Sequence, residues 1–178
     1  MSLGFLLDGK DDAVIWRGPK KNSMITQFID HVVWGDLDYL IIDTPPGTSD
    51  EHITIMEKLR TFPRKSAVLV TTPQAVSLGD VRREINFCEK ATLRITGIIE
   101  NMSGFICPYC EECNDVFSSG GGEAMAESLG LPFLGRIPLD PTLTTLIEES
   151  DFAETFMNSQ IYGQFQTISG LISGEKVL

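Results

Sequence analysis

The sequence predicts an α/β fold in which a mostly parallel sheet is flanked by helices. Short β-branched runs alternate with segments of helical period, and the runs are almost continuously apolar, as in parallel strands that are buried on both faces. The length of 178 residues fits a single domain, so we expect residues 1–178 to form one domain. Ligands of such sheets bind beyond the carboxyl ends of the strands, and the polar residues there are the candidates for function.

The elements can be assigned in order along the chain. Strands are expected at the apolar runs Leu3–Leu7, Tyr39–Ile42, Ala67–Val70, Ile95–Ile99 and Pro132–Ile137. Helices are expected where apolar residues recur every three or four positions, at 24–32, at 50–59, around 77–88, at 123–129 and in the tail from Thr142. Ser49 and Ser77 are candidate caps, the latter with Asp80 three residues on, and Gly130 is a candidate helix stop.

Composition excludes several classes of protein. Asp and Glu number 25 against 14 Lys and Arg, giving a net charge of -11, which disfavours nucleic acid as a partner. No apolar run approaches the roughly 18 residues of a membrane span, so no membrane partner is expected. Residues 1–8 contain no basic stretch and only a short apolar one, so a signal peptide is not expected there. We therefore expect a cytoplasmic protein, in which thiols stay reduced.

Three of the four cysteines, Cys107, Cys110 and Cys113, lie within seven residues, a spacing that indicates metal chemistry. A closed zinc site within one chain needs four donors, and a ferredoxin-type run needs a fourth cysteine where Phe117 stands. A redox pair is disfavoured by the acidic surroundings. Two thiolates from each of two chains would supply the Cys₄ donor set of a [4Fe–4S] cluster, with Cys113 as a spare or transfer ligand. Cys88, on an apolar helical stripe, is expected in the core.

Asp43 ends an apolar run and is followed by Thr-Pro-Pro-Gly47. A strand that delivers an Asp to its carboxyl edge is typical of the carboxylate that P-loop enzymes hold near Mg²⁺, and a glycine after it lets a backbone N–H approach a phosphate. Gly4 to Asp11 nearly fits the phosphate-loop spacing, but Asp11 replaces the required hydroxyl and Phe-Leu-Leu fills the loop. We reject that segment as a phosphate site.

Together these motifs resemble the Mrp/NBP ATPases of the MinD/ParA class of deviant P-loop proteins. The resemblance rests on the segments 14–21, 43–50, 70–74, 100–105 and 107–110. It is closest to the eukaryotic cytosolic iron–sulfur assembly factors. The resemblance implies that Cys107 and Cys110 bridge a labile [4Fe–4S] cluster between two subunits, which pass it to apo-proteins. It also implies that ATP and Mg²⁺ bind near the dimer interface. By the resemblance, Asp43 is the second Walker carboxylate, Gly47 is the glycine that senses the γ-phosphate, and Asn101 is the residue that contacts adenine.

The family's glycine-rich phosphate loop, its helix and its first switch have no counterpart in these 178 residues. The chain is either part of a longer product or a natural short form, and it is expected to bind ATP poorly because the phosphate cradle supplies most of the charge stabilisation. The main hypothesis is an ATPase-class iron–sulfur scaffold, paired with itself or with a paralogue. The alternative is a truncated, non-catalytic paralogue that binds metal or docks on a partner.

Overall fold

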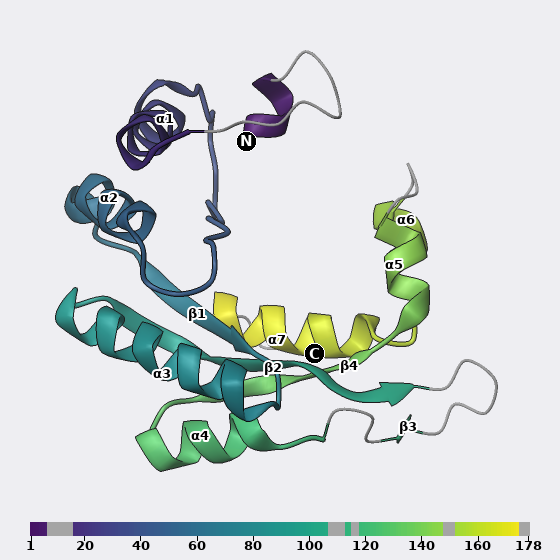
Figure 1. The fold of residues 1–178 in the computed structure, drawn as a ribbon. Coiled ribbons are helices and arrows are strands. Elements are labelled where there is room, and N and C mark those ends of the chain that lie inside the picture. Colours follow the sequence, from purple (N-terminus) through teal and green to yellow (C-terminus); the bar gives the residue numbers. More distant parts are fainter. Residues whose placement is uncertain (7–15, 107–112, 115–117, 148–151, 175–178) are drawn as a thin grey trace. The chain divides into compact units, whose positions relative to one another are not determined.

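The computed structural model describes residues 1–6, 16–106, 113–114, 118–147 and 152–174. The chain divides into two compact units, Met1–Lys65 and Ser66–Leu178, and each is described by itself. Figure 1 gives the order of the elements along the chain. The expectation that residues 1–178 form one domain stays a prediction.

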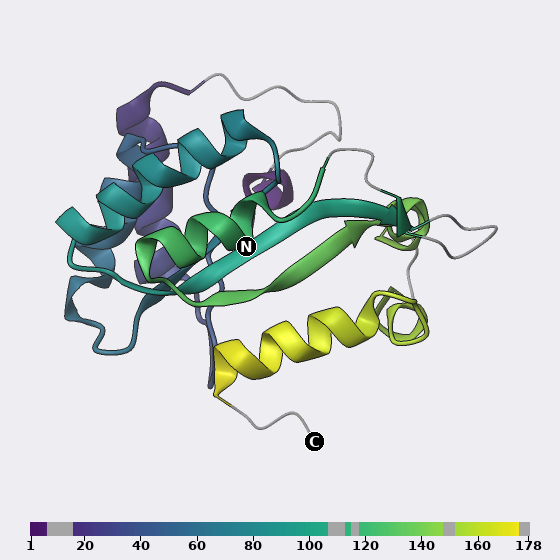
Figure 2. The same cartoon turned by 90° about the horizontal axis from the view of Figure 1, so that it is seen from below.

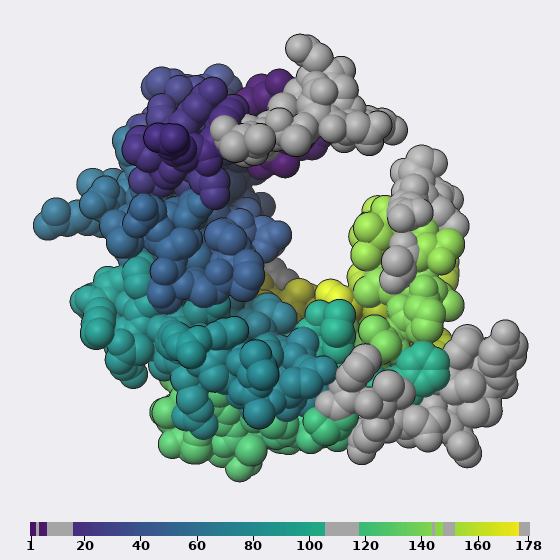
Figure 3. All heavy atoms as spheres, in the orientation of Figure 1, coloured from purple at the N-terminus to yellow at the C-terminus, as the bar shows by residue number. Residues whose placement is uncertain are grey.

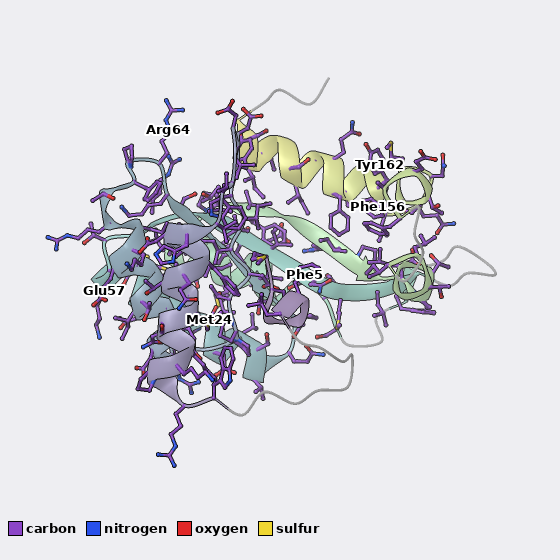
Figure 4. The ribbon with its side chains drawn as sticks, turned by 90° about the horizontal axis from the view of Figure 1, so that it is seen from above. Phe5, Met24, Glu57, Arg64, Phe156 and Tyr162 are labelled. Carbon is purple, nitrogen blue, oxygen red and sulfur yellow. The ribbon has the colours of Figure 1, made fainter. Side chains whose placement is uncertain are left out.

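The first unit is helical in its described part. Its elements are the 3₁₀ helix η1 (Leu3–Leu6), the α-helices α1 (Gly18–His31) and α2 (Asp50–Lys58), and the 3₁₀ helix η2 (Leu59–Thr61). The helices α1 and α2 contact one another, and two ion pairs join them, Lys21 to Glu51 at 3.1 Å and Lys58 to Asp30 at 2.5 Å. Met24 of α1 and Glu57 of α2 are labelled in Figure 4. Both helices had been expected from the apolar spacing.

Ser49 caps α2, as the sequence predicted, and its partner is a histidine. The backbone N–H of Ser49 donates to Nδ1 of His52 (3.2 Å), which completes a capping box at the first turn. The Ser49 hydroxyl also bonds Glu51, and together with Lys21 it lowers the pKa of the Glu51 carboxyl to about 2. His52, for which the sequence suggested no role, is therefore a structural cap.

Two strand predictions in this unit are wrong. Leu3–Leu6 forms a 3₁₀ helix, and Tyr39–Ile42 lies outside any strand. A strand is stable only when a neighbour takes up its backbone hydrogen bonds, and within the described part of the chain no strand pairs with residues 39–42. Consistent with this, Ile41 is 89% exposed. The apolar pattern identified a segment that is able to form a strand, but it did not show whether another strand is present to pair with it.

The second unit contains the sheet. Its strands are β1 (Ser66–Thr71), β2 (Arg94–Ile106), β3 (Cys113–Asn114) and β4 (Phe133–Leu139). The strand β2 is central, with β1 and β4 parallel on either side of it and β3 antiparallel to its end. This confirms the predicted α/β class and three of the predicted strands.

Helices cover both faces of the sheet, as Figures 1 and 2 show: α3 (Ala75–Lys90) and α4 (Gly121–Leu129) lie on one face and α7 (Tyr162–Ser173) on the other. Successive residues of β2 point to opposite faces, so Ile98 packs against α3 and α4 while Ile99 packs on the α7 side. Figure 3 shows the atoms of α4, in green, against those of α3, in teal. The central strand β2 is thus buried on both faces, as its apolar run predicted, whereas Val70 of the edge strand β1 is 54% exposed.

Cys88 lies in this core, 4% exposed, on the predicted stripe with Val81 and Ile85. Burial raises the pKa of its thiol, and the nearby Glu84 carboxylate adds to the shift. A thiol held in its neutral form is a poor metal ligand. The interpretation of Cys88 as a core residue is confirmed.

The tail is helical, as expected, and contains the short helices α5 (Pro141–Ile147) and α6 (Phe152–Phe156) before α7. Phe156 packs edge-to-face on Tyr162 at 5.7 Å between ring centroids, and Figure 4 shows this pair beside α7. Gly130 ends α4 in the left-handed conformation (φ 66°), as its position predicted. Among the described helices, none has the length and apolar character that a membrane span requires.

Candidate functional site

The carboxyl edge of the sheet gathers polar residues, as the fold class predicted. In the register of the parallel strands Thr71 of β1 is opposite Glu100 of β2, and Asn101 is opposite Ile137 of β4. The strand β1 therefore ends beside Glu100, whereas β2 continues in the same direction to Ile106 and β4 to Leu139, which pairs with Phe105. Such an edge is where parallel α/β sheets bind their ligands.

At the end of β1, hydroxyl groups hold the chain as it turns into α3. Thr71 is 2% exposed, and its Oγ1 lies 3.2 Å from Oγ of Ser77, which also accepts a hydrogen bond from the N–H of Thr72 (3.1 Å). Ser77 had been expected as the cap of the following helix. That expectation is wrong: α3 begins at Ala75, and the Ser77 hydroxyl instead satisfies the backbone at the end of β1.

Asn101 lies where β2 becomes irregular. Its Oδ1 accepts a hydrogen bond from the N–H of Met102 (2.9 Å), and Met102 has a φ of 54°, a left-handed conformation that a residue with a long side chain seldom adopts. The pairing of β2 with β4 shifts register between Asn101 and Phe105. Irregularities of this kind commonly re-aim side chains beside functional sites.

Glu100, next to Asn101, is a fully buried carboxylate surrounded by donors. Its Oε1 accepts hydrogen bonds from Oγ of Ser103 (2.5 Å) and the N–H of Gly120 (2.8 Å), and its Oε2 accepts one from the N–H of Gly122. Nε of Arg136 lies 4.0 Å from Oε1. Burial by itself would raise the pKa of Glu100, but the three hydrogen bonds and the arginine outweigh burial, so the pKa is lowered and the group is charged.

The cysteine-bearing segment leaves this edge of the sheet along β2 and returns through β3. Ile106 of β2 pairs with Cys113 of β3, and Phe105 pairs with Asn114. The six residues 107–112 therefore connect two residues that are neighbours across a strand pair. Cys107 and Cys110, the predicted cluster ligands, lie outside the described residues, and their role stays a prediction.

The two other predicted nucleotide residues lie in the first unit. Asp43 is exposed and follows the unpaired segment 39–42. Gly47 has a φ of 85°, a conformation that glycine adopts without strain, which explains a glycine at this turn. Asp43 and Gly47 thus belong to one unit and Asn101 to the other, and each assignment stays a prediction.

Sequence reasoning missed Glu100 and Ser103. The signal was present, because an acidic residue directly after the apolar run Ile95–Ile99 must be either exposed or fully paired. The sequence alone did not identify the hydrogen-bond donors of Glu100, because Gly120 and Gly122 are about twenty residues away from it along the chain. Only the packing of α4 against β2 brings them together.

A parallel sheet with helices on both faces and polar residues along its carboxyl edge defines the class of α/β proteins that bind ligands at that edge. The family model described as NUBPL iron-transfer P-loop NTPase, of the ParA group, matches residues 1–172. The chain belongs to this family. The resemblance to the Mrp/NBP ATPases is thereby confirmed.

Individual relatives agree with this assignment. The chain is 59% identical over 170 residues to the cytosolic Fe-S cluster assembly factor nubp2 of Xenopus tropicalis, an alignment that covers 95% of this chain and 63% of the relative. It is 57% identical over 170 residues to cytosolic Fe-S cluster assembly factor NUBP2 of Homo sapiens, with the same coverage of both chains. The chain thus spans somewhat less than two thirds of the length of these relatives.

The structure also resembles a solved one. A nucleotide-binding protein from Archaeoglobus fulgidus, determined in complex with ADP and with cobalt found by PIXE, superposes with a TM-score of 0.67 at 34% sequence identity. The match covers 88% of this chain and 61% of the other. The fold assignment therefore rests on sequence and structure together.

Proposed function

We propose that this chain takes part in cytosolic iron–sulfur cluster assembly by carrying a labile [4Fe–4S] cluster as cargo. Cys107 and Cys110 of this chain supply two ligands, and a second copy or a related partner supplies two more. The cluster then passes to apo iron–sulfur proteins. The family model and the names of the relatives support this role.

The observation that carries the proposal is the position of the cysteine segment. It begins at the end of the central strand β2 and returns beside it, with Cys113 paired to Ile106. Both ends of the segment are therefore anchored in the sheet, and the C-x-x-C pair lies in a short connection between them. Thiolates are the donors that iron–sulfur clusters take, and a pair from each of two chains makes the Cys₄ set.

We also propose that the carboxyl edge of the sheet takes part in binding ATP with Mg²⁺. Asn101 would contact adenine: since its Oδ1 accepts a hydrogen bond from the N–H of Met102, its amide Nδ2 would be the group that donates to a ring nitrogen of the base. Asp43 would lie near the Mg²⁺ ion and Gly47 near the terminal phosphate. The ADP complex of the archaeal neighbour supports a nucleotide role for this fold.

The test is the metal content of the protein. Wild-type chain, Cys107→Ala and Cys110→Ala are purified without oxygen, reconstituted with ferrous iron and sulfide, desalted, and analysed for iron and acid-labile sulfide. Cys88→Ala is the matched control, because it removes a thiol from the core and leaves the cysteine segment intact. We expect about four iron and four sulfide per two chains in the wild type and in Cys88→Ala, the content of one [4Fe–4S] cluster.

The variants at Cys107 and Cys110 should hold little of either element. Wild-type protein that holds no more iron than Cys107→Ala contradicts the cluster proposal. That result would favour the alternative, a non-catalytic paralogue that docks on a partner. Sedimentation with and without iron then shows whether metal joins two chains.

A further inference from the structure

The carboxylate of Glu100 connects two points of the chain that flank the cysteines, one before them in β2 and one after them at the start of α4. Within β2, which runs on to Ile106, it accepts a hydrogen bond from the Ser103 hydroxyl, and at the start of α4 it accepts hydrogen bonds from the N–H groups of Gly120 and Gly122. Residues 104–119 lie between these anchor points in the sequence. One buried side chain thus bonds to both stems of residues 104–119, the first stem at Ser103 and the second at Gly120–Gly122.

The same carboxylate caps α4. The residue before the helix, Gly120, has no side chain to accept a hydrogen bond from the first turn, and Glu100 of the neighbouring strand supplies the acceptor instead. A charge this deeply buried is stable only when donors surround it. Arg136 provides the counter-charge and also pairs with Glu123 on α4.

The glycines at the second stem fix its position further. A Cβ atom on Gly121 would lie 2.7 Å from the carbonyl oxygen of Pro73, and one on Gly122 would lie 2.9 Å from Cγ2 of Thr71 and 3.0 Å from Oε2 of Glu100. Only glycine allows the chain this close to the end of β1. The second stem is therefore held between β1 and Glu100 with little room to shift.

We propose that Glu100 is a positioning residue for cluster binding. By joining the two stems, it sets the spacing at which the chain enters and leaves residues 104–119, which include Cys107 and Cys110. The cost of bringing the two stems together is then met during folding, so that it does not oppose cluster binding. The inference rests on the proposed cluster role and adds a residue that does not itself touch the cluster.

The test compares how fast reconstituted proteins release iron to a ferrous chelator under anaerobic conditions. Glu100→Gln keeps the size of the side chain but loses the charge and the acceptor for Gly122. We expect its iron to be released about fivefold faster than in wild type, the factor by which losing one hydrogen bond commonly changes an equilibrium. Ser103→Ala loses only the hydrogen bond at the first stem. Its rate of iron release should lie between those of wild type and Glu100→Gln.

Two controls separate positioning from stability. Ile168→Val removes a methyl group from the α7 face of the sheet, away from Glu100, and Ile168→Ala extends the series so that one variant matches Glu100→Gln in melting temperature. Glu123→Gln removes the surface partner of Arg136. Ile168→Val, Ile168→Ala and Glu123→Gln should each release iron at the wild-type rate. If Glu100→Gln does not fold, Ser103→Ala against the Ile168 series carries the test.

Release from Glu100→Gln at the wild-type rate, in a wild type that holds more iron than Cys107→Ala, overturns the positioning role and leaves the proposed function standing. Equal release from Glu100→Gln and the matched Ile168 variant also overturns it, because the effect would then be one of stability. Wild type that holds no more iron than Cys107→Ala removes the proposed function and this inference together.

Discussion

Replacing Glu100 with glutamine should destabilise the second unit by an amount that its contacts allow to be worked out. Glutamine keeps one carbonyl oxygen for Ser103 and Gly120 but turns an NH₂ group toward the N–H of Gly122. A hydrogen bond to a charged group contributes about 1.5–3 kcal/mol, and a buried donor left unpaired costs about 1–3 kcal/mol. The glutamine variant does not bury a charge, and avoiding that cost offsets part of this loss. We therefore expect the free energy of unfolding to fall by about 2–4 kcal/mol.

The assay is urea unfolding at pH 7 followed by circular dichroism, with Glu123→Gln as the control. Glu123 is a half-exposed partner of Arg136, so its loss should cost less than about 1 kcal/mol. A midpoint for Glu100→Gln equal to that of wild type, with the same slope, would refute the reasoning. It would mean that the buried carboxylate contributes nothing net to the fold.

The difference in unfolding free energy between wild type and Glu100→Gln is predicted to depend on pH. Since the pKa of Glu100 is lowered in the folded state, its contribution to stability is complete above its ordinary pKa near 4.5 and is lost as the pH falls further. The difference in unfolding free energy between wild type and Glu100→Gln should therefore narrow as the pH is lowered from 6 to 3. A difference that stays constant or widens contradicts the assignment of a charged Glu100.

Three further outcomes are expected. The Glu51 carboxyl should titrate by NMR near its lowered pKa of about 2, and a midpoint near 4.5 would show that the Ser49 and Lys21 contacts are not maintained in solution. Ile98→Ala should lower the unfolding free energy by about 2–5 kcal/mol, because Ile98 is fully buried. Ile41→Ala, at an exposed position, should change it by less than about 0.5 kcal/mol. Equal effects of the two substitutions in urea unfolding would contradict the described burial. A protein consisting of residues 1–178 should bind ATP weakly and hydrolyse little of it, because its sequence contains no phosphate loop, and a calorimetric titration that gave micromolar affinity would contradict this.

The sequence predicted those parts of the fold in which a local pattern and its surroundings agree. The apolar runs at 67–70 and 95–99 became β1 and β2, because each pairs with a neighbouring strand and packs against α3, with α4 also against β2. The run at 39–42 has the same pattern and is not a strand, because no described strand pairs with it. The periodicity of a segment reports what its side chains prefer, whereas pairing depends on the rest of the chain.

The candidate site was predictable to a similar degree. That polar residues would gather toward the carboxyl ends of β1 and β2 followed from the fold class. The structure places Thr71 at the last position of β1, whereas Asn101 lies inside β2, which continues to Ile106. The role of Glu100 did not follow, because its partners come from a distant helix terminus and not from a motif. Ser77 shows the same limit: its spacing to Asp80 resembled a cap, but the hydroxyl satisfies the backbone of Thr72.

The central claim is that two chains share one cluster through Cys107 and Cys110, and native mass spectrometry of anaerobically reconstituted protein tests it most directly. We expect a species with the mass of two chains plus four iron and four sulfur atoms, present in wild type and in Cys88→Ala and lost in Cys107→Ala and Cys110→Ala. A wild-type spectrum that contains only metal-free chains, or single chains that each carry a complete cluster, would contradict it.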